Sequence, residues 1–320
     1  AFLVSSRAAD DGSVAYQTIR NAFLEVPLQE FAMNMLKKAN VSYVEAKKGS
    51  KKVLYVLGDA SLQMASIFKE ADFRRPLAKG VLAKGEVQAI EVLSNMLKEL
   101  LGEPSEPGES CYFSVPADAR DTGQDARYHE AQIAKIIETL GYTPKGLNEA
   151  HAVIFATCRE SDFSGLSFSF GAGMVNACLA YKSLPVLEFA VARGGDWIDE
   201  KAADSMGKGV PQITVLKEKE WDLRDPKKRE HEALAVYYKE LIKYLIDNLE
   251  DVFEENEPAL IEPIPVVVSG GTSLVKGFIE VFEQELRSRD LPIEISEVRH
   301  AKNPMNSVAA GLLMAAMLSG

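Results

Sequence analysis

Runs of apolar residues alternate with short polar turns along the chain, and the spacing of these runs predicts β-hairpins. Residues 2–6 and 13–19 are two such runs on either side of a turn at residues 9–12. Residues 166–181 repeat the arrangement, with the small residues Gly171-Ala172-Gly173 at the turn. Because the same device occurs twice, we predict two α/β halves that each open with a hairpin.

Helical spacing of apolar residues marks four further segments. Residues 131–140 are expected to form a helix that Gly141 ends, and residues 229–254 a long amphipathic helix. Residues 307–318 are rich in Ala, Leu and Met, and their small side chains predict close packing against another element. In the helix predicted over residues 86–101, the face expected to be buried carries Val87, Ile90, Leu93, Leu97 and Leu101.

A buried strand that runs into paired glycines stands out near the C-terminus, in the stretch Val266-Val267-Val268-Ser269-Gly270-Gly271-Thr272-Ser273. The two glycines allow a sharp turn and let a flat ligand lie against the backbone. Thr272 or Ser273 is expected to cap a following helix over residues 274–286, whose first N–H groups would attract anions. The pattern is typical of a nucleotide site and also of an ordinary strand–turn–helix corner, and it leaves both open.

The composition is that of a soluble, globular protein of the cytoplasm. The 320 residues carry a net charge of −11, which argues against a general nucleic-acid binder because such proteins need a basic face. No apolar run approaches the roughly 20 residues that a membrane span needs. The three cysteines and four histidines show no ligand spacing, so we expect reduced core thiols and no metal site built from side chains.

Five short stretches match motifs that occur together in one protein superfamily. They are residues 73–82 (FRRPLAKGVL), 146–153 (GLNEAHAV), 169–174 (SFGAGM), 216–220 (LKEKE) and 269–273 (SGGTS). In this order and spacing they resemble the actin-like ATPases, which include actin, MreB, ParM and the DnaK-type chaperones. The "RP…GVI" likeness of the first stretch places the chain nearest to the prokaryotic actin homologues.

The resemblance implies a fold of two similar α/β lobes, of the actin/ribonuclease-H-like type, with a nucleotide cleft between them. Lobe I would comprise residues 1–148, and lobe II, which binds adenosine, residues 149–320. The helix at residues 307–318 would pack back on lobe I.

The resemblance also implies a site for ATP or ADP with Mg²⁺. The second phosphate loop would be formed by Ser169, Gly171, Ala172 and Gly173. The base and ribose would lie near Lys217 and Glu218, and the adenosine end would be held by Gly270, Gly271, Thr272 and Ser273. Glycines suit such loops because main-chain N–H groups must approach phosphate oxygens closely.

Two departures from the family pattern bear on hydrolysis. Ser169 stands where the family has an aspartate that orients Mg²⁺-bound water, and Met174 replaces a threonine. The first phosphate loop, D-x-G-T, is expected upstream of the strand at residues 3–7. Slow ATP hydrolysis is therefore expected only if that loop precedes Ala1.

The candidate catalytic residues are two glutamates. Glu130 would position the attacking water, and Asp125 and His129 fit this role about as well. Glu149 would hold an Mg²⁺-bound water, or would be a surface carboxylate of its helix. Asp199, in the turn that begins at Gly194, is expected to cap a helix.

Two functions are implied by the resemblance. The first is an ATP-dependent, filament-forming cytoskeletal protein of a prokaryote, in which head-to-tail contacts do not close. The alternative is a non-polymerising nucleotide-binding switch or pseudo-ATPase scaffold, which Ser169 favours. The expected partners are a nucleotide and further copies of the chain, with no nucleic acid and no membrane span.

Overall fold

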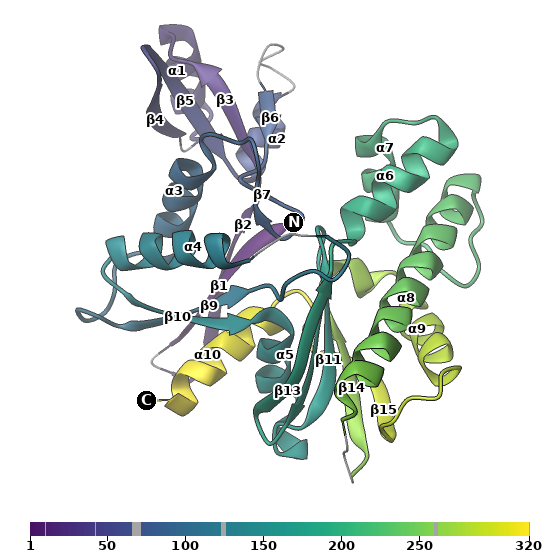
Figure 1. The fold of residues 1–320 in the computed structure, drawn as a ribbon. Helices are drawn as coiled ribbons and strands as arrows, with labels where there is room; N and C mark the ends of the chain where they lie inside the picture. Colours follow the sequence, from purple (N-terminus) through teal and green to yellow (C-terminus); the bar gives the residue numbers. More distant parts are fainter. Residues whose placement is uncertain (10, 42, 66–71, 123–125, 259–261, 320) are drawn as a thin grey trace. The chain divides into compact units, whose positions relative to one another are not determined.

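The computed structural model describes residues 1–9, 11–41, 43–65, 72–122, 126–258 and 262–319 (Figure 1). The chain forms two compact units. Unit 1 comprises residues 1–111 and 129–144, and unit 2 comprises residues 112–128 and 145–320. The halves predicted at residues 1–148 and 149–320 differ from these units in residues 112–128 and 145–148.

Unit 1 begins with the predicted hairpin, in which β1 (Phe2–Ala8) pairs antiparallel with β2 (Val14–Arg20). Next comes a four-stranded antiparallel sheet, in the order β4-β5-β3-β6. Its strands are β3 (Phe23–Pro27), β4 (Tyr43–Lys48), β5 (Lys51–Leu57) and β6 (Asp72–Arg74). A short hairpin of β7 (Leu77–Ala78) and β8 (Val81–Leu82) comes next.

Helices pack on both faces of this four-stranded sheet. Leu24 and Val26 of β3 contact buried residues of α1 (Glu30–Lys38) and α2 (Asp59–Ala65). Phe23 and Tyr55, on the opposite face, contact α3 (Ala89–Leu101). α4 (Arg127–Thr139) covers the helix predicted at residues 131–140.

The buried face predicted for α3 is wrong. Val87 precedes the helix and is 87% exposed, and Ile90 is also exposed. The helix begins at Ala89, later than predicted, and Val92 and Met96 pack on the sheet. The buried stripe therefore shares only Leu93 with the predicted one, and it consists of Ala89, Val92, Leu93, Met96 and Leu100.

Unit 2 is built on a five-stranded sheet in the order β13-β12-β11-β14-β15. The second predicted hairpin is confirmed, since β11 and β12 pair antiparallel, as do β12 and β13. β14 and β15 run parallel to β11. The strands are β11 (Gly165–Phe170), β12 (Val175–Tyr181), β13 (Leu184–Val191), β14 (Ile264–Ser269) and β15 (Ile295–His300).

Helices cover both faces of this sheet, so its central strands are buried throughout (Figure 1). Phe168 and Phe170 face the larger core, which includes residues of α6 (Gly195–Met206), α8 (Arg229–Asn256) and α9 (Phe278–Arg287). Ser167 points the other way and donates to Ala150 O of α5 (Glu149–Thr157) at 2.6 Å. This alternation is what the two-residue period of a strand requires.

The close packing predicted for residues 307–318 is confirmed. α10 (Ser307–Ser319) lies along α5, and a Cβ added at Gly311 would be 1.7 Å from Ala152 O. Only glycine allows such an approach of two helix backbones. The packing of α10 on lobe I stays a prediction.

The segment after β9 (Ser110–Val115) belongs to unit 2 because it bonds to the sheet there. Arg120 N donates to Ala190 O at 2.9 Å, and Ala117 N donates to Asn176 Oδ1 at 2.9 Å. β9 also pairs with β10 (Thr143–Asn148) in a two-stranded sheet.

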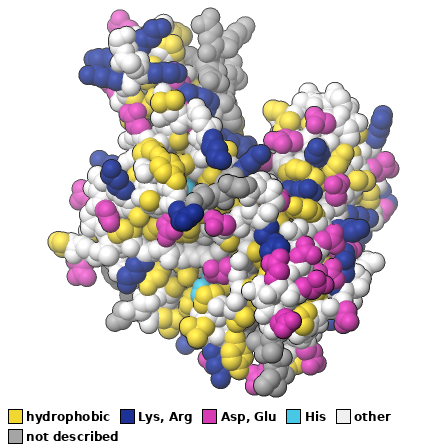
Figure 2. Space-filling view, viewed as in Figure 1, with side chains coloured by type: hydrophobic (Ala, Val, Ile, Leu, Met, Phe, Trp, Pro, Cys, Tyr) yellow, Lys and Arg dark blue, Asp and Glu magenta, His cyan; other side chains and the backbone are white. Residues whose placement is uncertain are grey.

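Acidic side chains gather on the face shown in Figure 2, in the region where Figure 1 draws α8. Among the described residues, no helix has the length and apolar character that crossing a bilayer would take.

Candidate nucleotide site

Three loops meet at one edge of the unit 2 sheet, where β11, β13 and β14 end. β14 is parallel to β11, and β13 has the same direction because both β11 and β13 are antiparallel to β12. The carboxyl ends of all three strands therefore lie at the same edge. This is the edge at which open α/β sheets bind ligands.

Hydrogen bonds join the three loops to one another. Gly195 N donates to Gly171 O at 3.1 Å, and Asp196 N donates to Ala172 O at 2.7 Å. From the third loop, Thr272 Oγ1 donates to Gly171 O at 2.8 Å. The phosphate loop predicted at residues 171–173 is thus held from two sides.

Glycines are needed where these loops touch. A Cβ added at Gly194 would be 2.6 Å from Ala172 O, which is closer than real side chains come. A Cβ at Gly195 would be 2.7 Å from Thr272 Oγ1 and 3.0 Å from the ammonium nitrogen of Lys217. These contacts bring together residues that the sequence places in three separate motifs.

The loop after β11 offers unused hydrogen-bond donors. Gly171 N donates to Met174 O at 2.9 Å and closes the turn. No group among the described residues accepts from the main-chain N–H groups of Ala172 or Gly173. Adjacent free N–H groups in a turn form a concave site that suits phosphate oxygens.

The capping role predicted for Thr272 and Ser273 is wrong. Residues 271–274 form a single 3₁₀ turn, and α9 begins only at Phe278, with Gly277 as its N-cap. Ser273 Oγ donates to Gly270 O at 2.8 Å, while Thr272 bonds across to the loop after β11. The extended backbone at Val275 separates the glycine turn from the helix.

The backbone at position 270 accommodates only glycine. Its φ of 94° lies in the left-handed region, and a Cβ there would be 2.2 Å from Phe170 O. The turn after β14 therefore lies directly against the end of β11. This close approach explains why the strand runs into paired glycines.

Lys217, predicted near the base and ribose, ends α7 (Val210–Lys217) and forms an ion pair beside the loops. Its Nζ donates to Asp199 Oδ2 at 2.8 Å and to Gly195 O at 2.9 Å. Asp199 is buried, and burial raises the pKa of its carboxyl while the Lys217 ammonium acts against that rise. Gly194 is the N-cap of α6, so the capping role predicted for Asp199 is wrong.

The sequence model of one protein family, Volactin, matches residues 2–316. The chain belongs to the Volactin family. None of the curated protein sequences compared with it matches.

Solved structures of actin-like proteins resemble this Volactin chain over almost its whole length. The MamK double helical filament is 18% identical, with a TM-score of 0.72, 99% of this chain covered and 98% of that one. A non-polymerising mutant of MamK bound to AMPPNP is 17% identical, with a TM-score of 0.57 and coverage of 99% and 98%. MreB5 of Spiroplasma citri bound to ADP is 12% identical, with a TM-score of 0.65 and coverage of 100% and 99%. These likenesses confirm the predicted actin-like α/β fold.

Glu149 lies at the same sheet edge of the Volactin chain. It begins α5, behind the N-cap Asn148, and its Oε2 accepts from Asn176 Nδ2 at 2.9 Å. Asn176 faces Ser169 across the β11–β12 pair. Glu149 is partly buried, and burial raises the pKa of its carboxyl to about 7. Its role with Mg²⁺ stays a prediction.

Two of the other catalytic candidates, Glu130 and His129, belong to unit 1. Glu130 is on α4 and in unit 1, and its role in positioning water stays a prediction. His129 beside it is buried, and burial lowers its pKa to about 4, so its ring is neutral at pH 7. Asp125 lies outside the described residues.

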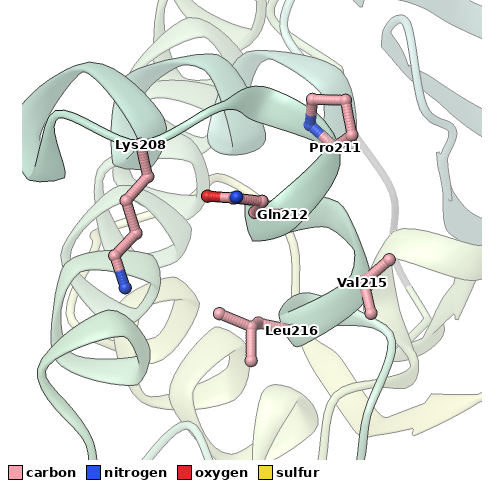
Figure 3. A pocket seen from close by; sticks show the side chains of 5 residues that line it. All are labelled: Lys208, Pro211, Gln212, Val215 and Leu216. Atoms are coloured by element: carbon pink, nitrogen blue, oxygen red, sulfur yellow. The ribbon is translucent and has the colours of Figure 1, made fainter.

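Glu218, the second residue predicted near the base, is exposed just after the end of α7. A surface pocket of about 460 Å³ lies beside the same helix (Figure 3). None of the predicted site residues lines it, so we place the candidate site at the glycine loops. The pocket is lined by Lys208, Pro211, Gln212, Val215 and Leu216.

Sequence reasoning missed the part that Gly194 and Gly195 play in the Volactin site. They come shortly after β13, with only Ala192 and Arg193 between, whereas Gly270 and Gly271 come directly after β14. Paired glycines close to the carboxyl end of a strand were therefore a signal that was present twice. The pairing of Lys217 with Asp199 had no such signal, because it depends on how α6 and α7 pack.

Proposed function

We propose that this Volactin-family protein binds ATP or ADP with Mg²⁺ and assembles into filaments in a nucleotide-dependent way. The observation that carries the proposal is the convergence of three glycine loops at Gly171 and Ala172, beside the N–H groups of Ala172 and Gly173, from which no described residue accepts a hydrogen bond. The names of similar proteins support it, since MamK forms a double helical filament, and a MamK mutant and MreB5 bind AMPPNP and ADP.

The residues present fit a nucleotide. Ala172 and Gly173 would donate to phosphate oxygens, and Gly270, Gly271 and Thr272 would approach the adenosine end. Mg²⁺, when bound, would neutralise phosphate charge. Glu149 is the carboxyl that could serve its bound water, because a nearby cation would favour the ionised form of a group whose pKa is about 7.

The alternative function, a non-polymerising nucleotide-binding switch or scaffold, is favoured by one observation. Ser169 is almost fully buried at the sheet edge and brings no charge where the actin-like family has an aspartate. Both functions need the same site, so they differ only in whether nucleotide binding leads to assembly.

Calorimetry with ATP·Mg²⁺ and ADP·Mg²⁺ tests binding, on full-length protein that includes any residues encoded before Ala1. Gly195→Val should weaken binding at least about tenfold, because its Cβ would fill the space between Thr272 and Lys217. Gly209→Val is the matched control, since only Pro211 Cδ, at 3.8 Å, lies near its Cβ. Wild-type protein that binds neither nucleotide would overturn the proposal.

Sedimentation and negative-stain electron microscopy then separate the two functions. Filaments that form with ATP·Mg²⁺ and not in EDTA support the polymer. A monomer that retains nucleotide but does not sediment at any concentration supports the switch. Filaments of the Gly195→Val protein that form without nucleotide would show that assembly does not depend on the site.

A further inference from the structure

A histidine, a cysteine and a glutamate meet on the face of the unit 2 sheet that α5 covers. Cys178 of β12 and Glu188 of β13 are direct partners in the antiparallel pair, so their side chains leave the sheet on the same face. His151, in the first turn of α5, lies above them, with Nδ1 3.8 Å from Glu188 Oε1. One ligand atom from each residue lies within 4.8 Å of the others.

The orientation of the His151 ring is fixed by a backbone carbonyl. Its Nε2 lies 3.0 Å from Ser183 O, and a carbonyl can only accept, so Nε2 carries the proton. The lone pair is then on Nδ1, which faces Glu188. Lys182 and Ser183 have φ values of 49° and 66°, and this tight β12–β13 turn brings the carbonyl to the ring. Metal-binding histidines are held by such a partner on the other ring nitrogen.

We propose that His151 Nδ1, Cys178 Sγ and the Glu188 carboxylate bind a divalent metal ion of the zinc type. Nitrogen, sulfur and oxygen donors together are the ligand set that zinc takes in proteins. In a tetrahedral site the ligand atoms would be about 3.3–3.6 Å apart, so shifts of about 1 Å would close this one. A thiolate and a carboxylate also balance the charge of the ion.

The burial of the three residues fits a site with one open position. Cys178 and His151 are buried, whereas a third of the Glu188 side chain is exposed. A metal ion can reach the cluster past Glu188, and water would complete the coordination there. The site lies apart from the glycine loops, because no residue of those loops contributes a ligand.

Without metal, the Cys178 thiol keeps its proton. Burial raises the pKa of the Cys178 thiol well above its usual range and also raises that of Glu188, to which the thiol is hydrogen-bonded. Cys158, the neighbouring thiol in the α5 cluster, raises the pKa of Cys178 further. Binding of the ion forms the metal–sulfur bond and releases the thiol proton to water.

Spacing along the chain could not reveal this cluster. The three residues are far apart in sequence and come from a helix and two strands. No C-x-x-C or His-x-x-x-His pattern marks them, which is why the sequence predicts core thiols and scattered histidines. Only the pairing of β12 with β13 and the position of α5 bring them together.

Cobalt is a suitable probe, because Co²⁺ bound to a thiolate has a charge-transfer band that aqueous Co²⁺ lacks. Reduced, chelator-treated full-length protein should bind one Co²⁺ with this band, and Zn²⁺ should displace it. Cys178→Ser should abolish the band, whereas Cys158→Ser, a buried neighbour outside the triad, should retain it. Glu188→Gln and His151→Gln should weaken binding at least about tenfold.

Circular dichroism on each variant checks that loss of the cobalt band is not caused by unfolding. Glu188 is partly exposed, so Glu188→Gln tests the site without disturbing the core. A zinc-dependent rise in the melting temperature of wild-type protein, absent in Glu188→Gln, would be a second supporting result. A folded wild-type protein whose cobalt spectrum equals that of Cys178→Ser would overturn the proposal. A band that Cys158→Ser abolishes and Cys178→Ser retains would also overturn it.

Discussion

The two hairpins of the chain look alike in sequence and differ in their surroundings. β1–β2 is a two-stranded sheet, and none of its residues is fully buried. β11–β12 has β13 on one side and β14 on the other, and every residue of β11 is buried. Their turns differ in the same way, since the turn at residues 171–174 bonds to two further loops.

The difference shows what converts a hairpin turn into a rigid binding loop. Local alternation is enough to form the strands, and it is present in both hairpins. Free N–H groups can be held in place for a phosphate only where neighbouring strands supply partners for the rest of the loop, as Gly195 and Thr272 do for Gly171. Preorganised donors of this kind need little rearrangement when a ligand binds.

The largest contrast is expected from removing one aromatic side chain in each hairpin. Phe168 is fully buried and makes an edge contact with Phe282, with ring centroids 5.2 Å apart, so Phe168→Ala should cost about 3–5 kcal/mol. Tyr16 on β2 is 37% exposed, and Tyr16→Ala should cost less than about 1 kcal/mol. Urea unfolding followed by tryptophan fluorescence measures both.

Fluorescence is informative here because both tryptophans, Trp197 and Trp221, lie in unit 2. Phe168→Ala should lower the fluorescence midpoint, and Tyr16→Ala should leave it unchanged. Circular dichroism would detect a loss confined to unit 1. Equal fluorescence losses in the two variants would mean that the hairpins do not differ as their burial indicates.

A second test compares two glycines that both have a positive φ. Gly12, in the β1–β2 turn, has φ 80° and Gly270 has φ 94°, so alanine meets an unfavourable positive φ at both. Gly12→Ala should cost about 1 kcal/mol, because nothing lies within 4 Å of its Cβ. Gly270→Ala should cost about 2–4 kcal/mol, because its Cβ overlaps Phe170 O and the strand must move. Similar unfolding midpoints for the two variants would show that the loop after β14 can shift to accommodate a Cβ at little cost in stability.

The sequence reveals the elements whose pattern is strong and local. Both hairpins, the strand at residues 264–269 and the long helix at residues 229–256 can be predicted from periodicity. The buried face of α3 cannot be predicted from periodicity, because Val87 and Ile90 are as apolar as the residues that are buried. The predicted stripe and the buried stripe lie on neighbouring faces of the same helix, and composition does not decide which of them meets the sheet.

The candidate site also has parts that can be predicted from the sequence and parts that cannot. The glycine loops carry a signal in sequence, since only glycine permits φ 94° at Gly270 or the close approach at Gly194. The Lys217–Asp199 pair and the His151–Cys178–Glu188 cluster carry none, because each depends on elements that meet only in the fold. Side-chain chemistry across elements is therefore what sequence reasoning could not supply.

The carboxyl near each hairpin turn gives a third test, in which pH acts with opposite signs. Burial raises the pKa of Glu149, bonded to Asn176 of β12, to about 7 from an ordinary 4.5. The protonated form is favoured by folding, so its stabilisation is complete below about pH 4.5 and is lost as pH rises through 7. Glu149→Gln keeps an acceptor for Asn176 and removes the titration.

Between pH 5 and 8 wild-type protein should lose about 2 kcal/mol relative to Glu149→Gln, measured by urea unfolding and tryptophan fluorescence. Asp59→Asn is a suitable control, because Asp59 is an exposed carboxyl of unit 1. A difference between wild type and Glu149→Gln that is independent of pH would mean that Glu149 ionises as an ordinary surface carboxylate. The two hairpins would then differ in how their side chains pack, but not in the titration of a nearby carboxyl.

The smallest effect is expected at Asp11, in the exposed turn of β1–β2. Hydrogen bonds from the Ser13 side chain and from Ser13 N, which is 2.9 Å from Asp11 Oδ1, lower the pKa of this carboxyl below 3.8. Its contribution is present above about pH 3.8 and is lost as pH falls through the lowered value, which is opposite to Glu149. Ser13→Ala removes the hydroxyl and keeps the N–H, so the Asp11 pKa should rise towards its ordinary value. Carbon-13 NMR titration of the aspartate carboxyls measures this directly, and the shift should be confined to Asp11. If Asp11 instead titrated above 3.8 in wild-type protein, both turns would favour protonation, and the difference in sign between an exposed and a buried hairpin would be lost.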